Sequence, residues 1–254
     1  MNDDSQTISA ATLTAETSAL DPEQLLRYVT ERFADKIALA SSFGAEDQVL
    51  TDMLFRVSAP PRIFTLDTGR LPQETYDVMA ATRQRYGIQI DIVFPDREQV
   101  EDMVNKHGPN FFYESIEARR LCCHARKVEP LKRALSGLQA WICGLRAQQS
   151  LTRTGLRRIE WDETFGLLKI APLADWTTEQ VWDYIKNNEV PYNKLHDEGY
   201  PSIGCAPCTR AIGPNDDIRS GRWWWEQPEH KECGLHWKDA DDKGNQEVPN
   251  HGSA

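Results

Sequence analysis

The sequence lacks any apolar run long enough to cross a membrane. A spanning helix needs about 20 consecutive apolar residues, and no segment of the 254-residue chain comes near that length. The first residues are acidic and polar, without the basic region and apolar core that mark a secretory signal. We therefore expect a cytoplasmic protein with no membrane partner.

Positive charge is also scarce. The chain has 29 Lys and Arg residues against 39 Asp and Glu residues, a formal net charge of −10. Nucleic acids and acidic membranes select basic surfaces, so we expect no nucleic-acid partner. A small anionic ligand stays compatible with this composition, because it needs only a local basic pocket.

Cysteine is rare, but it is concentrated. Four of the six cysteines form two clusters, the adjacent pair Cys122-Cys123 and the CxxC motif from Cys205 to Cys208. A reducing cytoplasm disfavours disulfides and favours a metal site or catalysis. Adjacent side chains diverge by about 100° on a helix, so placing both on one tetrahedral zinc ion would be strained. A [4Fe-4S] cluster offers separate irons, but zinc and unconnected buried cysteines remain open alternatives.

Apolar segments of strand type alternate with segments of helical periodicity. Expected strands are Ile37–Ala40, Arg62–Leu66, Ile88–Phe94 and Ala140–Gly144; expected helices begin at Pro22, Pro72 and Glu98, with others over 49–57, 122–135 and 177–187. This alternation predicts an α/β fold with a largely parallel sheet and helices on both faces. We expect a disordered arm over residues 1–20, an α/β domain over 21–225 that includes the cysteine clusters, and a flexible polar tail over 226–254.

Polar loops follow the expected strands. They are Ser41–Asp47, Leu66–Gly69, Phe94–Asp96 and Gly144–Arg153. Open α/β sheets bind ligands beyond the carboxyl ends of their strands, and Gly44 leads into a helix whose first amides could hold an anion. A plain turn would explain any one of these loops, but four at one sheet edge favour a nucleotide pocket.

Five basic residues lie in or near these loops and the cysteine clusters: Lys127, Arg146, Arg153, Arg219 and Arg222. Arg makes paired hydrogen bonds to tetrahedral oxyanions, so the set suits a ligand that carries such a group. For any single residue, a solvated surface position is the simpler explanation.

Three motifs together carry a family resemblance. LCCHARKVEPLKRAL, GCAPCTR and KECGLH resemble the assimilatory sulfonucleotide reductases, specifically those that reduce adenylyl sulfate (APS) and carry a [4Fe-4S] cluster. The similarity runs from about residue 30 to His236. It implies a cluster on Cys122, Cys123, Cys205 and Cys208, a catalytic Cys233, and thioredoxin or a glutaredoxin-like thiol donor as partner. The implied substrate-binding residues are Ser41, Leu66, Asp67, Thr68, Gly69, Lys127, Arg146, Arg153, Arg219 and Arg222.

The loops also resemble those of the adenine nucleotide alpha-hydrolases. SSFGAED stands where the relatives that cleave ATP carry an SGGxDS pyrophosphate loop, which suggests nucleotide binding without ATP cleavage. Sulfate-level sulfur needs two electrons to become sulfite, whereas a single [4Fe-4S] cluster ordinarily passes one. A dithiol supplies two by exchange. We therefore assign the cluster an architectural and electrostatic role, and the chemistry to the Cys233 thiolate.

Three other functions stay open. A reductase of the 3′-phosphorylated substrate (PAPS) is the nearest, although typical members lack the cluster cysteines. A tRNA-thiolating enzyme would need an intact ATP-cleaving loop, and an iron–sulfur redox sensor would need a basic DNA-binding module. The sequence is compatible with a homo-oligomer but does not decide the oligomeric state.

Overall fold

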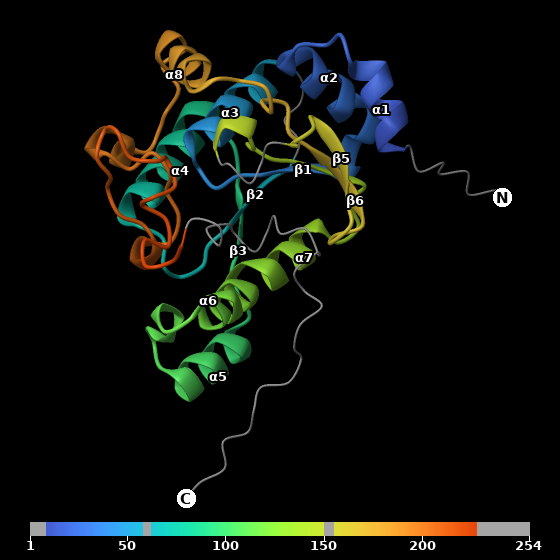
Figure 1. Ribbon diagram of the computed structural model, residues 1–254. Coiled ribbons are helices and arrows are strands. Elements are labelled where there is room, and N and C mark those ends of the chain that lie inside the picture. The colour runs from blue at the N-terminus through green and yellow to red at the C-terminus, as the bar shows by residue number, and fades with distance from the viewer. Residues whose placement is uncertain (1–8, 58–61, 150–154, 228–254) are drawn as a thin grey trace, which may run out of the picture.

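The computed structural model describes residues 9–57, 62–149 and 155–227, which build a six-stranded sheet with helices on both faces (Figure 1). The strand order is β3-β2-β1-β4-β6-β5, and every neighbouring pair is parallel except β5 with β6. The strands are β1 (Ile37–Ala40), β2 (Arg62–Leu66), β3 (Asp91–Val93), β4 (Ala140–Ile142), β5 (Ile159–Asp162) and β6 (Leu167–Ile170). The predicted α/β class is confirmed. Strand order reverses between β1 and β4, the place where such sheets bind ligands.

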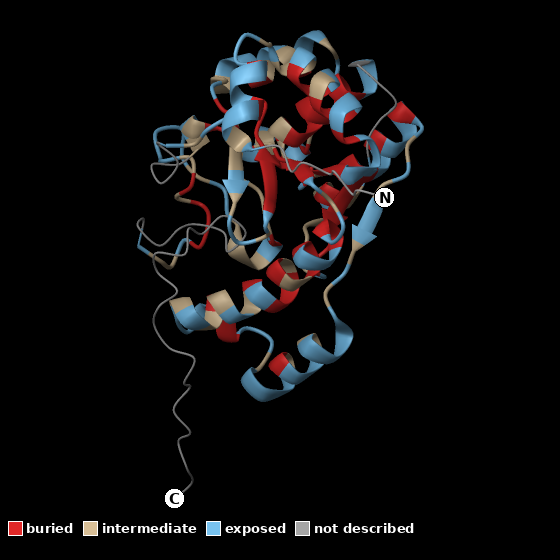
Figure 2. Cartoon of the chain, turned by 90° about the vertical axis from the view of Figure 1, so that its right-hand side faces the viewer, coloured by how far each residue is buried: buried red, intermediate tan, exposed pale blue. Residues whose placement is uncertain are grey.

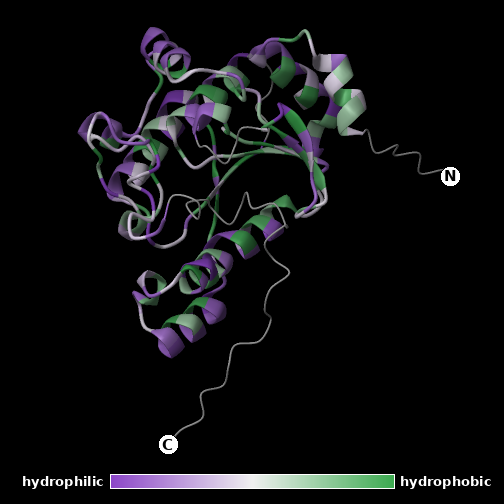
Figure 3. Ribbon diagram, in the orientation of Figure 1, coloured by the Kyte–Doolittle hydropathy of each residue, from purple (hydrophilic) through white to green (hydrophobic). Residues whose placement is uncertain are grey.

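Strand side chains alternate between two cores. Ile37 and Leu39 of β1 belong to the core under α1 (Ala10–Thr17), α2 (Pro22–Phe33), α3 (Ala45–Val57) and α8 (Thr178–Asn187). Ala38 of the same strand belongs to the opposite core under α7 (Glu129–Leu135). This alternation is the two-residue period of a strand, and Figure 2 shows the buried residues concentrated along the sheet and on the inner sides of the helices. Hydropathy follows the same division, with hydrophobic strands and hydrophilic outer helix faces (Figure 3).

Helix starts follow the sequence signals. Asp21 caps α2 in a capping box with Gln24, and Thr177 caps α8 in a capping box with Gln180. Each box satisfies backbone groups that the first helical turn leaves unbonded. The helices α4 (Gln73–Tyr86) and α5 (Arg97–His107) begin within a residue or two of their expected starts.

The expected disordered arm over residues 1–20 is corrected by the structure. Residues 1–8 lie outside the described part, but helix α1 occupies Ala10–Thr17, and its Leu13 side chain is fully buried in the main core. Tyr28 of α2 donates a 2.6 Å hydrogen bond to Glu16. The segment carries one large apolar side chain per two turns, too few for the periodicity to reveal a packed helix.

The hairpin of β5 and β6 was not predicted from the sequence. Its turn closes through a 2.7 Å hydrogen bond from the Gly166 amide to the Asp162 carbonyl. Lys169 interrupts the apolar run of β6, yet it is buried, 3.5 Å from Glu160 and over the ring of Trp141. A lysine in the sequence indicates an exposed polar position. Because this lysine is instead buried with a carboxylate partner and an aromatic face, the hydropathy pattern does not indicate the strand.

The helical segment around the cysteine pair differs from the single helix expected over 122–135. Helix α6 (Ile116–Cys123) ends at the pair, a π-helical turn covers His124–Val128, and α7 follows. Figure 1 shows α5 and α6 projecting beyond the sheet, with α7 leading back to it. In the described part of the chain, no helix is long and apolar enough to span a membrane.

Candidate active site

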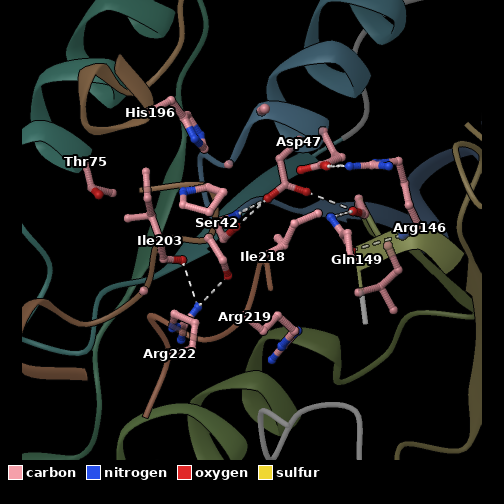
Figure 4. A pocket seen from close by; sticks show the side chains of 18 of the residues that line it. Ser42, Asp47, Thr75, Arg146, Gln149, His196, Ile203, Ile218, Arg219 and Arg222 are labelled. Atoms are coloured by element: carbon pink, nitrogen blue, oxygen red, sulfur yellow. Dashed lines mark hydrogen bonds and ion pairs between the residues drawn. The ribbon is translucent and has the colours of Figure 1, made fainter. Parts of the chain in front are cut away.

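A cavity of about 680 Å³ opens at the carboxyl ends of β1, β2 and β4. Ligand pockets for small molecules commonly measure about 300–1,000 Å³, so the space suits a nucleotide. Figure 4 shows side chains from distant parts of the chain pointing into it. Seven of the predicted substrate-binding residues line the cavity: Ser41, Leu66, Thr68, Lys127, Arg146, Arg219 and Arg222.

The loop after β1 is closed by its own carboxylate. Asp47 accepts hydrogen bonds of 2.6 Å from both the amide and the hydroxyl of Ser42, and one of 3.1 Å from the Gly144 amide (Figure 4). A β-carbon on Gly144 would fall 2.9 Å from the Glu46 β-carbon. Only glycine therefore allows the segment after β4 to lie this close to the start of α3. The Asp47 carboxylate therefore places a negative charge in the loop after β1 and occupies the Ser42 and Gly144 amides, which disfavours an anionic ligand at those two groups.

Burial raises the pKa of Asp47 to about 6, and the hydrogen bonds from Ser42 oppose that rise. Burial disfavours the charged carboxylate, whereas donated hydrogen bonds favour it. The carboxylate is therefore ionised at neutral pH but takes up a proton in mildly acidic solution.

One wall of the cavity is apolar. It consists of Ala40, Phe64, Leu66, Leu131, Trp141, Cys143 and Leu145. Cys143 is buried, as expected of a small hydrophobic residue. Such a wall suits the flat face of a purine base.

Another part of the lining is cationic. Arg219 and Arg222 are both buried, and their guanidinium carbons lie 5.6 and 4.6 Å from the centre of the Trp223 ring. Arg222 donates to the Ser202 hydroxyl and the Ile203 carbonyl (Figure 4), while its Nε is buried without a hydrogen-bond partner among the described residues. Lys127 completes this part of the lining. Buried cations of this kind favour an anionic ligand.

Arg146 lines the cavity, but its guanidinium is engaged by the protein. It pairs with Glu46 at 2.8 Å and donates to the Trp176 carbonyl and the Thr178 hydroxyl. These contacts anchor the start of α8 to the loops after β1 and β4. Arg153, predicted to act with it, lies outside the described residues.

The residues of the Leu66–Gly69 loop have two different roles. Leu66 and Thr68 face the cavity, whereas Asp67 and Gly69 do not line it. Asp67 accepts hydrogen bonds from the Tyr76 hydroxyl at 3.0 Å and from the Gly69 amide at 2.8 Å. The backbone of Gly69 has a φ of +70°, a region that favours glycine. The structure thus gives these two residues a role in shaping the loop.

The four clustered cysteines meet in a second, smaller cavity. Cys122, Cys123, Cys205 and Cys208 all line it, although the two pairs come from distant parts of the sequence. Five cationic side chains line the same cavity, namely Arg70, Arg119, Arg126, Lys127 and Arg222. Lys127 and Arg222 also line the large cavity. The two cavities therefore share a basic wall.

The π-helical turn sets how the cysteine pair is oriented relative to helix α7. The pair ends α6, and the turn at His124–Val128 then changes the helical repeat before α7 begins. A π-turn contains more residues per turn than an α-helix and occurs frequently at functional sites. The turn lets the cysteines and Lys127 face the cavities while Leu131 and Leu135 stay in the core.

The CxxC loop is held from several sides. The Cys205 sulfur lies 3.2 Å from the Thr68 hydroxyl, and the Ala206 amide donates to the Arg70 carbonyl. The Tyr113 hydroxyl donates to the Pro207 carbonyl at 2.7 Å. These contacts fix the loop against the end of β2, so the cysteine cavity adjoins the large one.

Proton affinities show that the cysteines influence one another. Burial raises the pKa of Cys208 to about 12, with a further rise from Cys205 and opposing effects of Lys127 and Arg222. Burial likewise raises the pKa of Cys122, and Arg126 opposes it. A bound metal would reverse this preference for the protonated thiol, because metal coordination deprotonates thiols.

The residues around this cavity fit an iron–sulfur cluster chemically. Four thiols are the usual ligand set, and no Asp or Glu lines the cavity, while five cations can balance the negative charge of a thiolate-ligated cluster. Within the described ranges, no three His, Cys, Asp or Glu side chains form a group that could hold a single metal ion.

Several lining residues escaped the sequence analysis. His196 packs against Trp182, and both of its ring nitrogens are buried without hydrogen-bond partners in the described part. Burial lowers its pKa, with partial compensation from Glu46. His196, Ser202, Ile203 and Ile218 lie in segments that lack a strand or helix pattern, so no periodic signal could have found them. Cys233 lies outside the described residues.

Comparisons with known proteins agree with this geometry. A family model described as "Phosphoadenosine phosphosulfate reductase domain" matches residues 36–211. A protein of Allochromatium vinosum named adenosine 5′-phosphosulfate reductase is 55% identical over 81% of this chain and 80% of its own length. One of the same name from Burkholderia cepacia is 50% identical, over 88% of this chain and 92% of its own length.

Solved structures share the overall fold. The crystal structure of a phosphoadenylyl-sulfate (PAPS) reductase from Candida auris in complex with phosphate is similar with a TM-score of 0.68 and 30% identity. The match covers 80% of this chain and 96% of that one. An FMN adenylyltransferase of Candida glabrata in complex with ATP has a TM-score of 0.54 at 16% identity, covering 89% and 77% of the two chains. At that identity the similarity concerns the fold alone.

Proposed function

The chain belongs to the phosphoadenosine phosphosulfate reductase domain family, and from this premise we propose that it reduces adenosine 5′-phosphosulfate (APS) to sulfite and AMP in sulfate assimilation. Relatives that are 43–55% identical over most of the chain carry the name adenosine 5′-phosphosulfate reductase. The proposal places the reaction in the cytoplasm, where thiols are kept reduced.

The shared basic wall is the observation that carries this proposal. The adenosine part would lie along the apolar wall of the large cavity, and the phosphosulfate at Lys127, Arg219 and Arg222. Arg222 and Lys127 also line the cysteine cavity, so the reacting sulfur would lie beside it. Because Asp47 closes the loop after β1, the negative end of the nucleotide is directed away from that loop.

We assign the [4Fe-4S] cluster to Cys122, Cys123, Cys205 and Cys208. When bound, such a cluster would tie α6 to the CxxC loop and supply an electrostatic environment for the neighbouring anion. The Thr68 hydroxyl beside Cys205 and the cations around the cavity support this assignment.

The chemistry itself belongs to thiols. In our proposal the Cys233 thiolate attacks the sulfur of APS, the bond from that sulfur to the phosphate oxygen breaks, and AMP leaves as an anion. Cys233 then carries an S-sulfonate. A thioredoxin thiolate attacks the Cys233 sulfur and expels sulfite, and the second thioredoxin thiol releases Cys233 by forming the thioredoxin disulfide. Two electrons pass from the dithiol to the substrate sulfur, and a glutaredoxin-like donor could replace thioredoxin in this step.

The role of the arginines is to hold and neutralise the leaving group. A guanidinium donates paired hydrogen bonds to phosphate oxygens, and charge on those oxygens increases as the bond to sulfur breaks. Stabilisation that grows toward the transition state accelerates the step. No strong general acid is required, because the phosphate leaves as a stable anion.

An assay of sulfite release tests the proposal. The protein, purified without oxygen, is mixed with reduced thioredoxin and either APS or PAPS in parallel. We expect sulfite and AMP from APS at a much higher rate than sulfite from PAPS. Faster release from PAPS would contradict the substrate assignment, and no release from either would contradict the proposed reaction.

A further inference from the structure

Arg119 of helix α6 forms the most deeply buried ion pair that the described part of the chain contains. Its side chain is 1% exposed and that of Glu226 is 3% exposed. The guanidinium donates from Nε to one carboxylate oxygen at 2.6 Å and from Nη2 to the other at 2.9 Å. Paired hydrogen bonds of this kind fix both the position and the orientation of the two groups.

The same guanidinium faces the ring of Trp223. Its carbon lies 4.7 Å from the ring centre, while Arg222 and Arg219 lie 4.6 and 5.6 Å from the same centre. Trp223 is 1% exposed, and its backbone φ is +40°, a conformation that costs energy for a bulky residue. Surrounding contacts must therefore impose the position of this indole.

Two of those contacts lie in the backbone. The Trp223 amide donates to the Cys208 carbonyl at 3.1 Å, and the Glu226 amide donates to the Trp223 carbonyl at 2.8 Å. Glu226 thus holds the turn that follows Trp223 and, through Arg119, ties this turn to α6. The indole is therefore in contact with Arg119 and with both arginines of the large cavity.

Arg119 also interacts with the cysteine pair. Its side chain lines the cysteine cavity together with Cys122 and Cys123. One side chain therefore contacts the cysteine cavity, the indole and the carboxylate of the turn. Core packing alone does not explain a charged side chain at this position, because an apolar residue would fill the same space without the cost of desolvating a charge.

We propose that Arg119 is a positioning residue for the anion site. With Glu226 it fixes Trp223, and through the indole it sets the places of the Arg219 and Arg222 guanidiniums that hold the phosphate of the nucleotide. This inference rests on the proposed function, which assigns those two arginines to the anion. Arg119 itself lines only the cysteine cavity, not the large one.

Binding of AMP and of adenosine distinguishes a residue that positions the two arginines from one that only stabilises the fold. AMP carries the 5′-phosphate that Arg219 and Arg222 would contact, whereas adenosine lacks it and uses only the rest of the cavity. A general loosening of the fold would weaken both ligands alike. Misplaced arginines would weaken AMP alone.

The experiment compares two variants by calorimetric titration with AMP and with adenosine. Glu226→Gln keeps the shape of the carboxylate but removes its charge. The double variant Arg119→Met/Glu226→Leu replaces both partners with apolar residues, a change that often restores stability to a buried pair. We expect both proteins to lose about tenfold in AMP affinity, comparable to one charge-assisted hydrogen bond, with adenosine affinity unchanged.

Arg56→Met is the matched control, since it breaks the 2.7 Å pair of Arg56 with the buried Asp52, remote from both cavities. It should leave the ratio of AMP to adenosine affinity at the wild-type value. An unchanged ratio in Glu226→Gln and in a folded double variant would overturn the positioning role and leave Arg119 as a brace. If wild-type protein bound AMP no more tightly than adenosine, the anion site itself would be wrong, and the proposed function would fail with it.

Discussion

Gly204 lies directly against the guanidinium of Arg222, and a β-carbon at this position would fall 2.6 Å from the arginine Cζ. The arginine donates to the Ser202 hydroxyl and the Ile203 carbonyl immediately before that glycine. The segment just before the CxxC motif therefore determines where a cation of the large cavity lies. Since real Cβ contacts are never this close, a larger residue would have to displace the guanidinium.

Gly204→Ala should accordingly weaken nucleotide binding while keeping the fold. We expect AMP affinity to fall by about tenfold or more, the equivalent of losing one charge-assisted contact. Titration calorimetry measures the affinity, and Gly155→Ala is the control, because its β-carbon would meet open space. Equal AMP affinity in the two variants would show that Arg222 does not contact the ligand.

Arg222→Ala tests the same contact directly. Removing a hydrogen bond to a charged group typically costs about 1.5–3 kcal/mol, so AMP should bind at least about tenfold more weakly. Arg97→Ala on α5, where the side chain is mostly exposed and pairs with Glu98 and Glu101 at 3.9–4.0 Å, should have no effect. Similar losses in both would indicate a nonspecific effect of net charge.

Asp47→Asn should change how stability depends on pH. The folded-state pKa of about 6 lies above the ordinary value of 3.8, so between these values the folded protein binds more protons than the unfolded chain. Stability of the wild type therefore falls as pH rises through this window and levels off above it. Relative to Asp47→Asn, the wild type should lose roughly 2 kcal/mol between pH 4 and pH 7.

Urea unfolding followed by tryptophan fluorescence at several pH values measures this difference. Asp96→Asn at the exposed cap of α5 serves as the control for a carboxylate that is not buried. A pH-independent difference between wild type and Asp47→Asn would mean that the carboxylate is already ionised throughout the range.

Cys205→Ser should abolish the iron–sulfur cluster. Wild-type protein purified without oxygen should be brown and contain about four irons and four sulfides per chain, as a cubane requires. The variant should lose that colour and most of its iron, while Cys143→Ala, at a buried cysteine outside the cysteine cavity, should keep both. Stoichiometric zinc without acid-labile sulfide in the wild type would refute the assignment.

Cys233→Ser should bind APS but not turn it over. A hydroxyl presents almost no anion near neutral pH, whereas a thiol does. Intact-protein mass spectrometry after mixing wild type with APS, in the absence of thioredoxin, should show one added sulfonate on the peptide that contains Cys233. An adduct on another cysteine, or full sulfite production by the variant, would overturn the mechanism.

Much of the fold was predictable because its elements are locally specified. Asp21 and Thr177 mark the starts of their helices through capping boxes, and the central strands β1 and β4 are continuous apolar runs. Helix α1 and the β5–β6 hairpin were not predictable, because their burial depends on partners elsewhere in the chain, as for Leu13 and Lys169. Tertiary contact decides such segments more than local pattern does.

The candidate site shows the same division. The cysteine motifs and three of the four strand-end loops contribute residues to the two cavities, whereas Phe94–Asp96 lines neither. The motifs also do not show how each residue is used. Arg146 reads as a ligand-binding cation, yet Glu46 engages it, and Asp67 supports its own loop through Tyr76. Arg119 and Glu226 carry no sequence signal at all, since they are separated by more than a hundred residues and only the fold makes them a pair.

The π-helical turn at His124–Val128 makes the length of this segment as important as its composition. Deleting one residue would restore a continuous α-helix and rotate everything before it by about 100° relative to everything after it. The cysteine pair could then no longer face the cysteine cavity while the leucines of α7 remain in the core. We expect a relative that is one residue shorter in this segment to have lost the arrangement, even if it retains both cysteines. The length of the segment between the cysteine pair and α7 therefore carries information that percentage identity does not.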